Sequence, residues 1–88
     1  MPRQILFAPS ANLDEDIVKN AIGSAIRKLR KQHRLTQGQV AELAGLHRTF
    51  YGNLERGVHS VSVFNLIKIS KSIGCEPEDV FNLAKKDY

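Results

Sequence analysis

A pattern of two short helices joined by a tight turn, at residues 36–56, constrains the fold more than any other feature of the chain. Thr36 and Gln39 have the spacing of a capping box, which predicts that the first helix begins here. Gly45 can adopt the positive φ angle that ends a helix in a tight turn. A second helix follows the glycine, and two helices joined in this way form a helix-turn-helix.

The apolar residues of both short helices are spaced to face a common core. The expected apolar face of the first helix consists of Val40, Leu43 and Ala44. The second helix runs from about His47 to Arg56 and turns Tyr51 and Leu54 inward. Polar side chains therefore open the second helix on its other side.

A long helix precedes this pair, because apolar residues recur at helical spacing from Leu13 to Leu29. Asn12 is its expected N-cap, and it ends near Gln32. Gly23 lies inside this helix and is expected to weaken it by about 1 kcal/mol relative to alanine.

Two further helices follow the pair, and no segment has the alternating pattern of a strand. Ser62 or Ser60 caps the first of them, and Gly74 ends it. Its expected core face consists of Val63, Leu66, Ile67, Ser70 and Ile73. Pro77 suits the first turn of the last helix. The apolar residues of that helix are Val80, Phe81 and Leu83.

The sequence therefore predicts an all-α, five-helix domain over residues 13–88, preceded by an N-terminal arm at residues 1–12. The arm mixes apolar residues with two prolines and shows no periodicity. Disorder, packing on its own domain and contact with a partner all remain open for the arm.

Basic charge is concentrated in the middle of the chain. Between Lys19 and Lys71 there are ten basic and two acidic residues, a net charge of +8, whereas the first 18 and the last 17 residues each carry −2. A surface that binds a polyanion requires such a concentration of positive charge.

Several classes of function are disfavoured. Cys75 is the single cysteine, so it cannot form an intrachain disulfide, which fits a protein of the reducing cytoplasm. We expect Cys75 to be a buried core residue. No apolar run is long enough to span a membrane. His33, His47 and His59 lack metal-ligand spacing, so we expect no metal, cofactor or enzymatic activity. We expect no small-molecule effector, because these 88 residues leave little room for a separate sensing domain.

The polar residues that open the second short helix suit base recognition, since this part of a helix-turn-helix faces the DNA major groove. The expected base-contacting residues are His47, Arg48, Thr49 and Asn53. Arg48 can hold guanine O6 and N7 with two parallel hydrogen bonds, which contribute about 1–3 kcal/mol of discrimination. The Thr49 methyl group can pack on a thymine methyl group. Asn53 can pair with adenine, or it can lie deep enough in the helix to reach only the DNA backbone.

Phosphate contacts are expected on both sides of these residues. The free N–H groups at the start of the first short helix favour a phosphate near Thr36 and Gln37, although capping is the favoured role of Thr36. Further candidates are Arg56, His59, Ser60 and Ser62. Such contacts position a protein on DNA without specifying a sequence. Lys68 and Lys71 are expected to be solvated surface charges.

Many spaced residues between about positions 20 and 83 form a larger pattern. They are Thr36-Gln37, Val40-Ala41, Gly45-Leu46, Arg48-Thr49, Leu54-Glu55-Arg56-Gly57, Leu66-Ile67-Lys68-Ile69 and Ile73-Gly74. This pattern resembles the Xre / lambda-repressor-like helix-turn-helix family. The resemblance implies a five-helix domain that binds a palindromic operator as a homodimer. It also implies a phosphate contact from Gln37, positions for Arg48, Thr49 and Asn53 that contact or approach bases, and a structural pair between Arg30 and Glu55.

Within that family, two segments are similar to the small controller proteins of restriction–modification systems. They are His47-Arg48-Thr49-Phe50 and Val61-Ser62-Val63-x-Asn65. The chain departs from the family at Tyr51, Gly52 and Val61, where Ile or Val, Ser and Pro are common. The Tyr51 hydroxyl must therefore find a partner or reach solvent, and Gly52 removes a possible DNA contact.

Apolar residues beside the expected core faces predict a two-fold interface. The expected interface residues are Phe64, Ile69, Phe81 and Leu83. We therefore expect a homodimeric transcription regulator that binds double-stranded DNA. Two alternatives remain open. One is an antitoxin whose arm or last helix occupies a toxin, and the other is a helical protein-interaction module that does not bind DNA.

Overall fold

A computed structural model describes residues 13–88, which fold into five α-helices and a short 3-10 helix with no strand. The helices are α2 (Glu15–Gln32), α3 (Gln37–Ala44), α4 (Arg48–Glu55), α5 (Val63–Ile73) and α6 (Pro77–Ala84), followed by η2 (Lys85–Asp87). The predicted all-α, five-helix fold is therefore confirmed over these residues. The predicted arm at residues 1–12 lies outside the described part of the chain.

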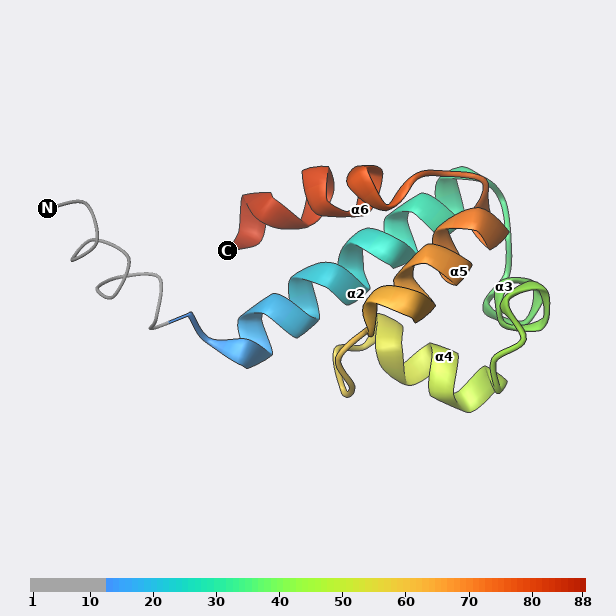
Figure 1. Cartoon of the computed structure of the whole chain (residues 1–88), viewed down its shortest axis with the longest axis horizontal. Coiled ribbons are helices and arrows are strands. Elements are labelled where there is room, and N and C mark those ends of the chain that lie inside the picture. Colours follow the sequence, from blue (N-terminus) through green and yellow to red (C-terminus); the bar gives the residue numbers. More distant parts are fainter. Residues whose placement is uncertain (1–12) are drawn as a thin grey trace, which may run out of the picture.

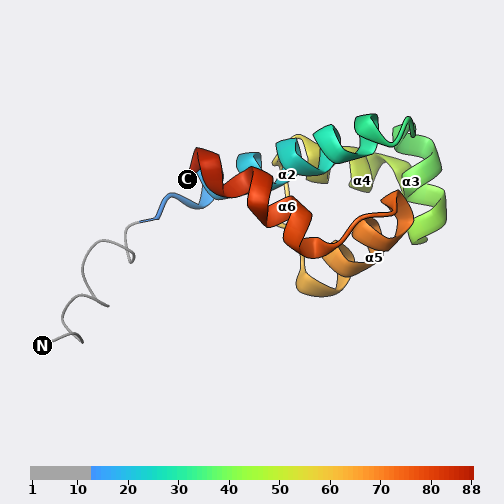
Figure 2. The same cartoon turned by 90° about the horizontal axis from the view of Figure 1, so that it is seen from above.

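The long helix α2 is the element around which the others are arranged (Figure 1). It packs against α6, α4 and α5, while α3 contacts both α4 and α5. Figure 2 shows α3 and the turn after it at the end of the molecule opposite the C-terminus. The helix-turn-helix formed by α3 and α4 is thus held by α2 and α5 and is not an isolated pair.

Local sequence signals fix most helix ends. Ser62 is the cap of α5, since its Oγ accepts a hydrogen bond from the Asn65 N–H at 3.0 Å, and Ser60 is not. Gly74 ends α5 with a φ angle of 97°. At the start of α2 the prediction of Asn12 was wrong, because the helix begins at Glu15 with Asp14 as its N-cap. The Asp14 carboxylate accepts hydrogen bonds from two backbone N–H groups of the first turn.

The core is continuous across the five helices. Its fully buried side chains include Ile26, Val40, Tyr51, Leu54, Ile69 and Val80. Cys75 is half-buried and packs against this core. Burial raises the pKa of the Cys75 thiol above its ordinary value.

Four residues were assigned to the wrong side of their helices. Leu43, Val63 and Ile67 were expected in the core, but they are exposed. Ile69 was expected at a dimer interface, but none of its surface is accessible. In α5 the face that packs against α3, α6 and α2 carries Leu66, Ile69, Ser70 and Ile73, which turns Val63 and Ile67 outward.

Gly23 has a packing role that helix propensity does not show. A Cβ at this position would lie closer than 3.0 Å to the backbone carbonyl oxygens of Leu54 and Glu55. The absence of a side chain therefore lets α2 approach the end of α4 and fixes the position of the helix-turn-helix on α2.

Candidate nucleic-acid interface

The turn between α3 and α4 has the geometry that the sequence predicted. Thr36 and Gln39 form the capping box that begins α3. Gly45 ends α3 in the left-handed region, with a φ angle of 68°. The Leu46 N–H then donates to the Ala41 carbonyl oxygen at 2.8 Å, which closes the turn. These bonds set α4 at a fixed orientation to α3.

The first turn of α4 presents three polar side chains to solvent. His47 is the N-cap, and its Nδ1 accepts a hydrogen bond from the Thr49 N–H at 3.2 Å. Arg48 and Thr49 are exposed beside it, whereas Tyr51 and Leu54 on the opposite face are fully buried. The start of α4 therefore lies outside the core, although the Arg48 side chain passes close to Gly38 of α3, where a Cβ would lie 3.8 Å from Arg48 Nε.

Glu55 is the centre of a buried polar network that joins three helices. Its two carboxylate oxygens accept from Arg30 Nε at 2.6 Å and Arg30 Nη2 at 3.1 Å. The Gln37 side-chain amide donates to the same carboxylate at 3.0 Å. Burial alone would raise the pKa of Glu55, but the hydrogen bonds from Arg30 and Gln37 outweigh it and lower this pKa. The expected pairing of Arg30 with Glu55 is confirmed.

A polar cavity of about 410 Å³ lies next to this network. Its lining residues are Arg27, Arg30, Gln37, Glu55 and Arg56, from α2, α3 and α4. Arg30 and Glu55 neutralise each other, so the exposed guanidinium groups of Arg27 and Arg56 leave the cavity positively charged. The geometry suits an oxyanion such as a phosphate group.

Arg27 was not among the predicted site residues. The sequence analysis included it only in the basic charge between Lys19 and Lys71. A usable signal was its spacing of three residues from Arg30, since residues at this spacing lie on one helix face.

Asn53, near the end of α4, interacts directly with Arg56, the residue that caps the C-terminus of this helix. The Asn53 Oδ1 accepts a hydrogen bond from Arg56 Nη2 at 2.5 Å. The guanidinium group lies beside Gly52, where a Cβ would be 3.3 Å from Arg56 Nη1. The Asn53 side chain is thus hydrogen-bonded to Arg56, and it lies about one turn further along α4 than the exposed residues at the start of the helix.

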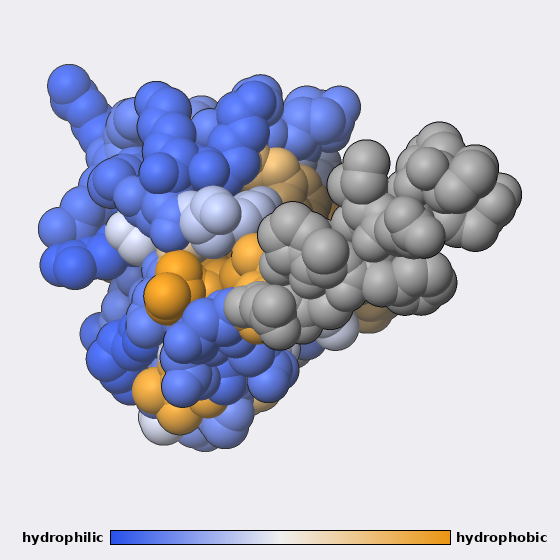
Figure 3. All heavy atoms as spheres, turned by 90° about the vertical axis from the view of Figure 1, so that its left-hand side faces the viewer, coloured by the Kyte–Doolittle hydropathy of each residue, from blue (hydrophilic) through white to orange (hydrophobic). Residues whose placement is uncertain are grey.

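The other predicted phosphate-contacting residues do not gather at one place. The Thr36 and Ser62 hydroxyls accept the capping hydrogen bonds of α3 and α5. The His59 ring stacks on Phe50, with 5.7 Å between the ring centroids. Ser60 lines a different, mostly apolar groove of about 330 Å³ between α2, α5 and α6. At the end of the molecule where α2 begins, apolar side chains gather between hydrophilic areas (Figure 3).

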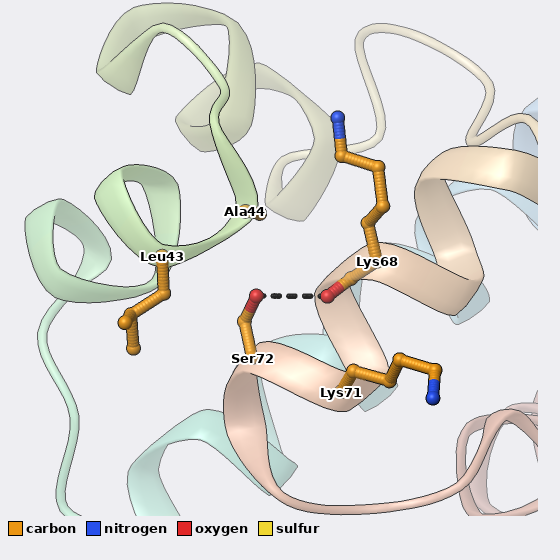
Figure 4. A pocket seen from close by; sticks show the side chains of 5 residues that line it. All are labelled: Leu43, Ala44, Lys68, Lys71 and Ser72. Carbon is orange, nitrogen blue, oxygen red and sulfur yellow. Dashed lines mark hydrogen bonds between the residues drawn. The ribbon is translucent and has the colours of Figure 1, made fainter.

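Lys68 and Lys71 lie at an open hollow between α3 and α5. The hollow is also lined by the exposed Leu43, and the Ser72 hydroxyl donates to the Lys68 carbonyl oxygen at 2.8 Å (Figure 4). The two lysine side chains extend in different directions, and the Lys68 ammonium lies 5.2 Å from the centroid of the Phe64 ring. Their charges do not converge on one point, so we assign no ligand to this hollow.

Two further observations concern residues 13–88. None of the helices described there is long and apolar enough to cross a membrane. No cluster of three or more His, Cys, Asp or Glu side chains in this part of the chain has an arrangement that could hold a metal ion.

Comparison with known proteins gives consistent matches. The HTH_3 (Helix-turn-helix) family model matches residues 26–80. The control protein C.BamHI of Bacillus amyloliquefaciens is 33% identical over 66 residues, which cover 74% of this chain and 82% of that protein. The crystal structure of the clp gene regulator ClgR from C. glutamicum superposes with a TM-score of 0.77 at 28% identity, covering 78% of this chain and 90% of ClgR. The restriction-modification controller protein C.AhdI from Aeromonas hydrophila has a TM-score of 0.68 at 35% identity, over 70% of this chain and 94% of C.AhdI.

Proposed function

The chain belongs to the HTH_3 helix-turn-helix family, and from this premise we propose that it is a sequence-specific DNA-binding transcription regulator. In this proposal α4 is the recognition helix and enters the major groove with its N-terminal turn. His47, Arg48 and Thr49 then face the base edges, and Arg48 contributes most of the sequence discrimination.

The exposed polar turn at the start of α4 is the observation that carries this proposal. His47, Arg48 and Thr49 are all solvent-exposed, and α4 is held from behind by the buried Tyr51 and Leu54. A helix whose first turn is polar and lies outside the core can enter a groove without unfolding any part of the core.

The positive cavity supports a DNA backbone contact beside the recognition helix. Arg27 and Arg56 face it from α2 and α4, and Gln37 lies at the first turn of α3. The side-chain amide of Gln37 carries two N–H groups. It gives one of them to Glu55, so the other remains for a phosphate oxygen. A phosphate held here would fix the position of α4 in the groove, as backbone contacts do in general.

We also propose that the protein acts as a homodimer on a palindromic operator. Phe64 on α5 is 69% exposed and Phe81 on α6 is 46% exposed, and Val63 and Ile67 add apolar surface to α5. Leu83 is half-buried and packs against the core, so it would contribute only at the edge. Ile69 is removed from the interface because it is fully buried. A two-fold pairing of the exposed α5 and α6 surfaces would cover these side chains.

The more specific proposal is a controller of restriction–modification genes. C.BamHI is a control protein and C.AhdI a restriction-modification controller protein, and each matches most of its own length to this chain. The residues of the proposed DNA interface, from Arg27 on α2 to Arg56 at the end of α4, all lie inside the segment that matches the family.

Binding of the full chain to duplex DNA over a range of salt concentrations tests the proposed function. We expect log Kd to change linearly with log salt, since phosphate contacts release counterions from DNA. We also expect tighter binding to sites selected from random DNA than to a random duplex. Binding that is equally weak on all duplexes at low salt would contradict sequence-specific regulation.

A further inference from the structure

We propose that Asn53 acts on DNA only through Arg56. It holds the Arg56 guanidinium over Gly52, in position to bind a backbone phosphate, and does not itself contact a base. This assignment rests on the proposed DNA-binding function and changes the role of one residue within it.

The hydrogen bond between the two side chains is the first step of the argument. An asparagine that recognises adenine uses its amide oxygen to accept from N6 and its amide N–H to donate to N7. Here the Asn53 Oδ1 already accepts from Arg56 Nη2 at 2.5 Å, in a bond strengthened by the charge of the guanidinium. Recognition of adenine would require Asn53 Oδ1 either to share its acceptor sites with the guanidinium or to give up this charge-assisted bond.

The close approach of the Arg56 guanidinium to Gly52 is the second step of the argument. Its position on α4 is buried, and a Cβ there would lie 3.3 Å and 3.6 Å from the two terminal nitrogens of Arg56. The guanidinium therefore covers the bare backbone of Gly52. An alanine at this position would push the guanidinium aside by a few tenths of an ångström, because the nearest atoms belong to the far end of a flexible side chain.

The position of the Arg56 side chain at the positive cavity is the third step of the argument. Together with Arg27 it lines the positive cavity beside the first turn of α3. A Cβ on Gly52 would also lie 3.6 Å from the Gln37 Oε1. The Gln37 amide and the Arg56 guanidinium therefore lie close to each other above this glycine. Asn53 and Gly52 together thus aim a cation at the phosphate site and away from the base edges.

A double-mutant cycle tests this assignment, with Kd measured for the full chain on a selected site and on a random duplex. Asn53→Ala should weaken binding to both duplexes by a similar factor of about three to ten, the weight of one net hydrogen bond. It should leave base preference unchanged, and it should have no further effect in an Arg56→Ala background. Asn82→Ala on the exposed side of α6 makes the same chemical change away from the cavity and should have no effect.

Gly52→Ala provides an independent readout. Alanine favours the helix, so the melting temperature should stay the same or rise, while DNA affinity should fall by a factor similar to that of Asn53→Ala. Unchanged affinity in Gly52→Ala would overturn the proposed role of the glycine. A loss in Asn53→Ala that persists without Arg56, or that relaxes preference at one base pair, would show that Asn53 contacts DNA directly. If the wild-type chain bound no duplex at any salt concentration, the proposed function itself would fail, and this assignment with it.

Discussion

Arg30 near the end of α2 and Glu55 at the end of α4 form a buried, bidentate ion pair, with 2.6 Å between Arg30 Nε and Glu55 Oε2. Arg30 also donates to the Leu35 carbonyl oxygen at 2.7 Å, just before α3. Because Gln37 on α3 donates to Glu55 as well, the pair ties together the three helices that surround the positive cavity. It therefore sets the geometry of the helix-turn-helix as well as its stability.

Replacing Glu55 with Gln should lower the free energy of unfolding by about 3 kcal/mol. Removal of one partner leaves the other as an uncompensated buried charge, and such changes cost about 3–5 kcal/mol. The low end applies because the glutamine oxygen still accepts one hydrogen bond. Urea unfolding at pH 7 measures the effect, with Glu42→Gln on the exposed side of α3 as the control that should change little. A loss as small as that of the control would mean that the pair does not stabilise the fold.

The same pair predicts how stability depends on pH. The pKa of Glu55 in the folded protein is lowered from its ordinary value of 4.5. The stabilisation is therefore complete above pH 4.5 and is lost as the pH falls through the lower, folded-state pKa. The difference in unfolding free energy between wild type and Glu55→Gln should shrink over this range. A difference that stays constant down to pH 2 would contradict a lowered pKa.

Gly23→Ala should destabilise the protein by about 2 kcal/mol, although alanine is the better helix former. A Cβ at Gly23 would collide with backbone carbonyl oxygens of α4, which cannot rotate away as a side chain can. Gly38→Ala in α3 is the matched control, because its Cβ would meet nothing closer than 3.8 Å. Thermal unfolding should show a lower melting temperature for the first variant and an equal or higher one for the second. The opposite order would show that α2 and α4 do not pack as described.

Tyr51→Phe should leave stability unchanged or raise it by up to about 1 kcal/mol. Within residues 13–88 the buried Tyr51 hydroxyl has no hydrogen-bond partner, and an unpaired buried hydroxyl is unfavourable. Burial, and after it the nearby carboxylate of Glu55, raise the pKa of Tyr51, so the hydroxyl stays neutral. Urea unfolding decides the point. Destabilisation by more than 1 kcal/mol would mean that the hydroxyl donates to Glu55 in solution.

If the wild type forms the proposed homodimer at micromolar concentration, Phe64→Asp should convert it to a monomer, as measured by sedimentation of both proteins. In the proposed interface a charge at position 64 would be buried among apolar side chains, and it cannot be desolvated there without a large cost. Leu43→Asp on α3 is the matched control, since Leu43 is 65% exposed and Phe64 is 69% exposed. If both variants or neither became monomeric, the interface would lie elsewhere.

Short-range signals in the sequence predicted the ends of the helices well. The Thr36–Gln39 capping box and the turns at Gly45 and Gly74 depend on neighbouring residues only, so the sequence contains all that determines them. The start of α2 was missed by two residues because Asp14 and Asn12 are both good caps and only the position of the first turn distinguishes them.

Contacts between helices were harder to predict. A stripe of apolar residues along a helix does not show which of its edges will be covered by other helices. In α5 we therefore predicted that Ile67 is buried and Ile69 is at an interface, whereas Ile67 is exposed and Ile69 is buried. The roles of Arg27 and Asn53 depend on side chains that meet only after folding, at the positive cavity and at Arg56. The residues that we propose contact bases, at the start of α4, could be proposed without such contacts, because a polar turn directly after a helix-ending glycine is visible in the sequence itself.

Selection of bound sites from a pool of random duplex DNA, with the wild type and with Arg48→Ala, tests the central claim most directly. The wild type should enrich an inverted repeat whose half-site centres lie about one DNA turn, roughly 34 Å, apart. Arg48→Ala should enrich the same repeat with the preference lost at one base pair of each half-site. Failure of the wild type to enrich any sequence, or an unchanged base preference in Arg48→Ala, would contradict the assignment of α4 as the helix that recognises DNA sequence.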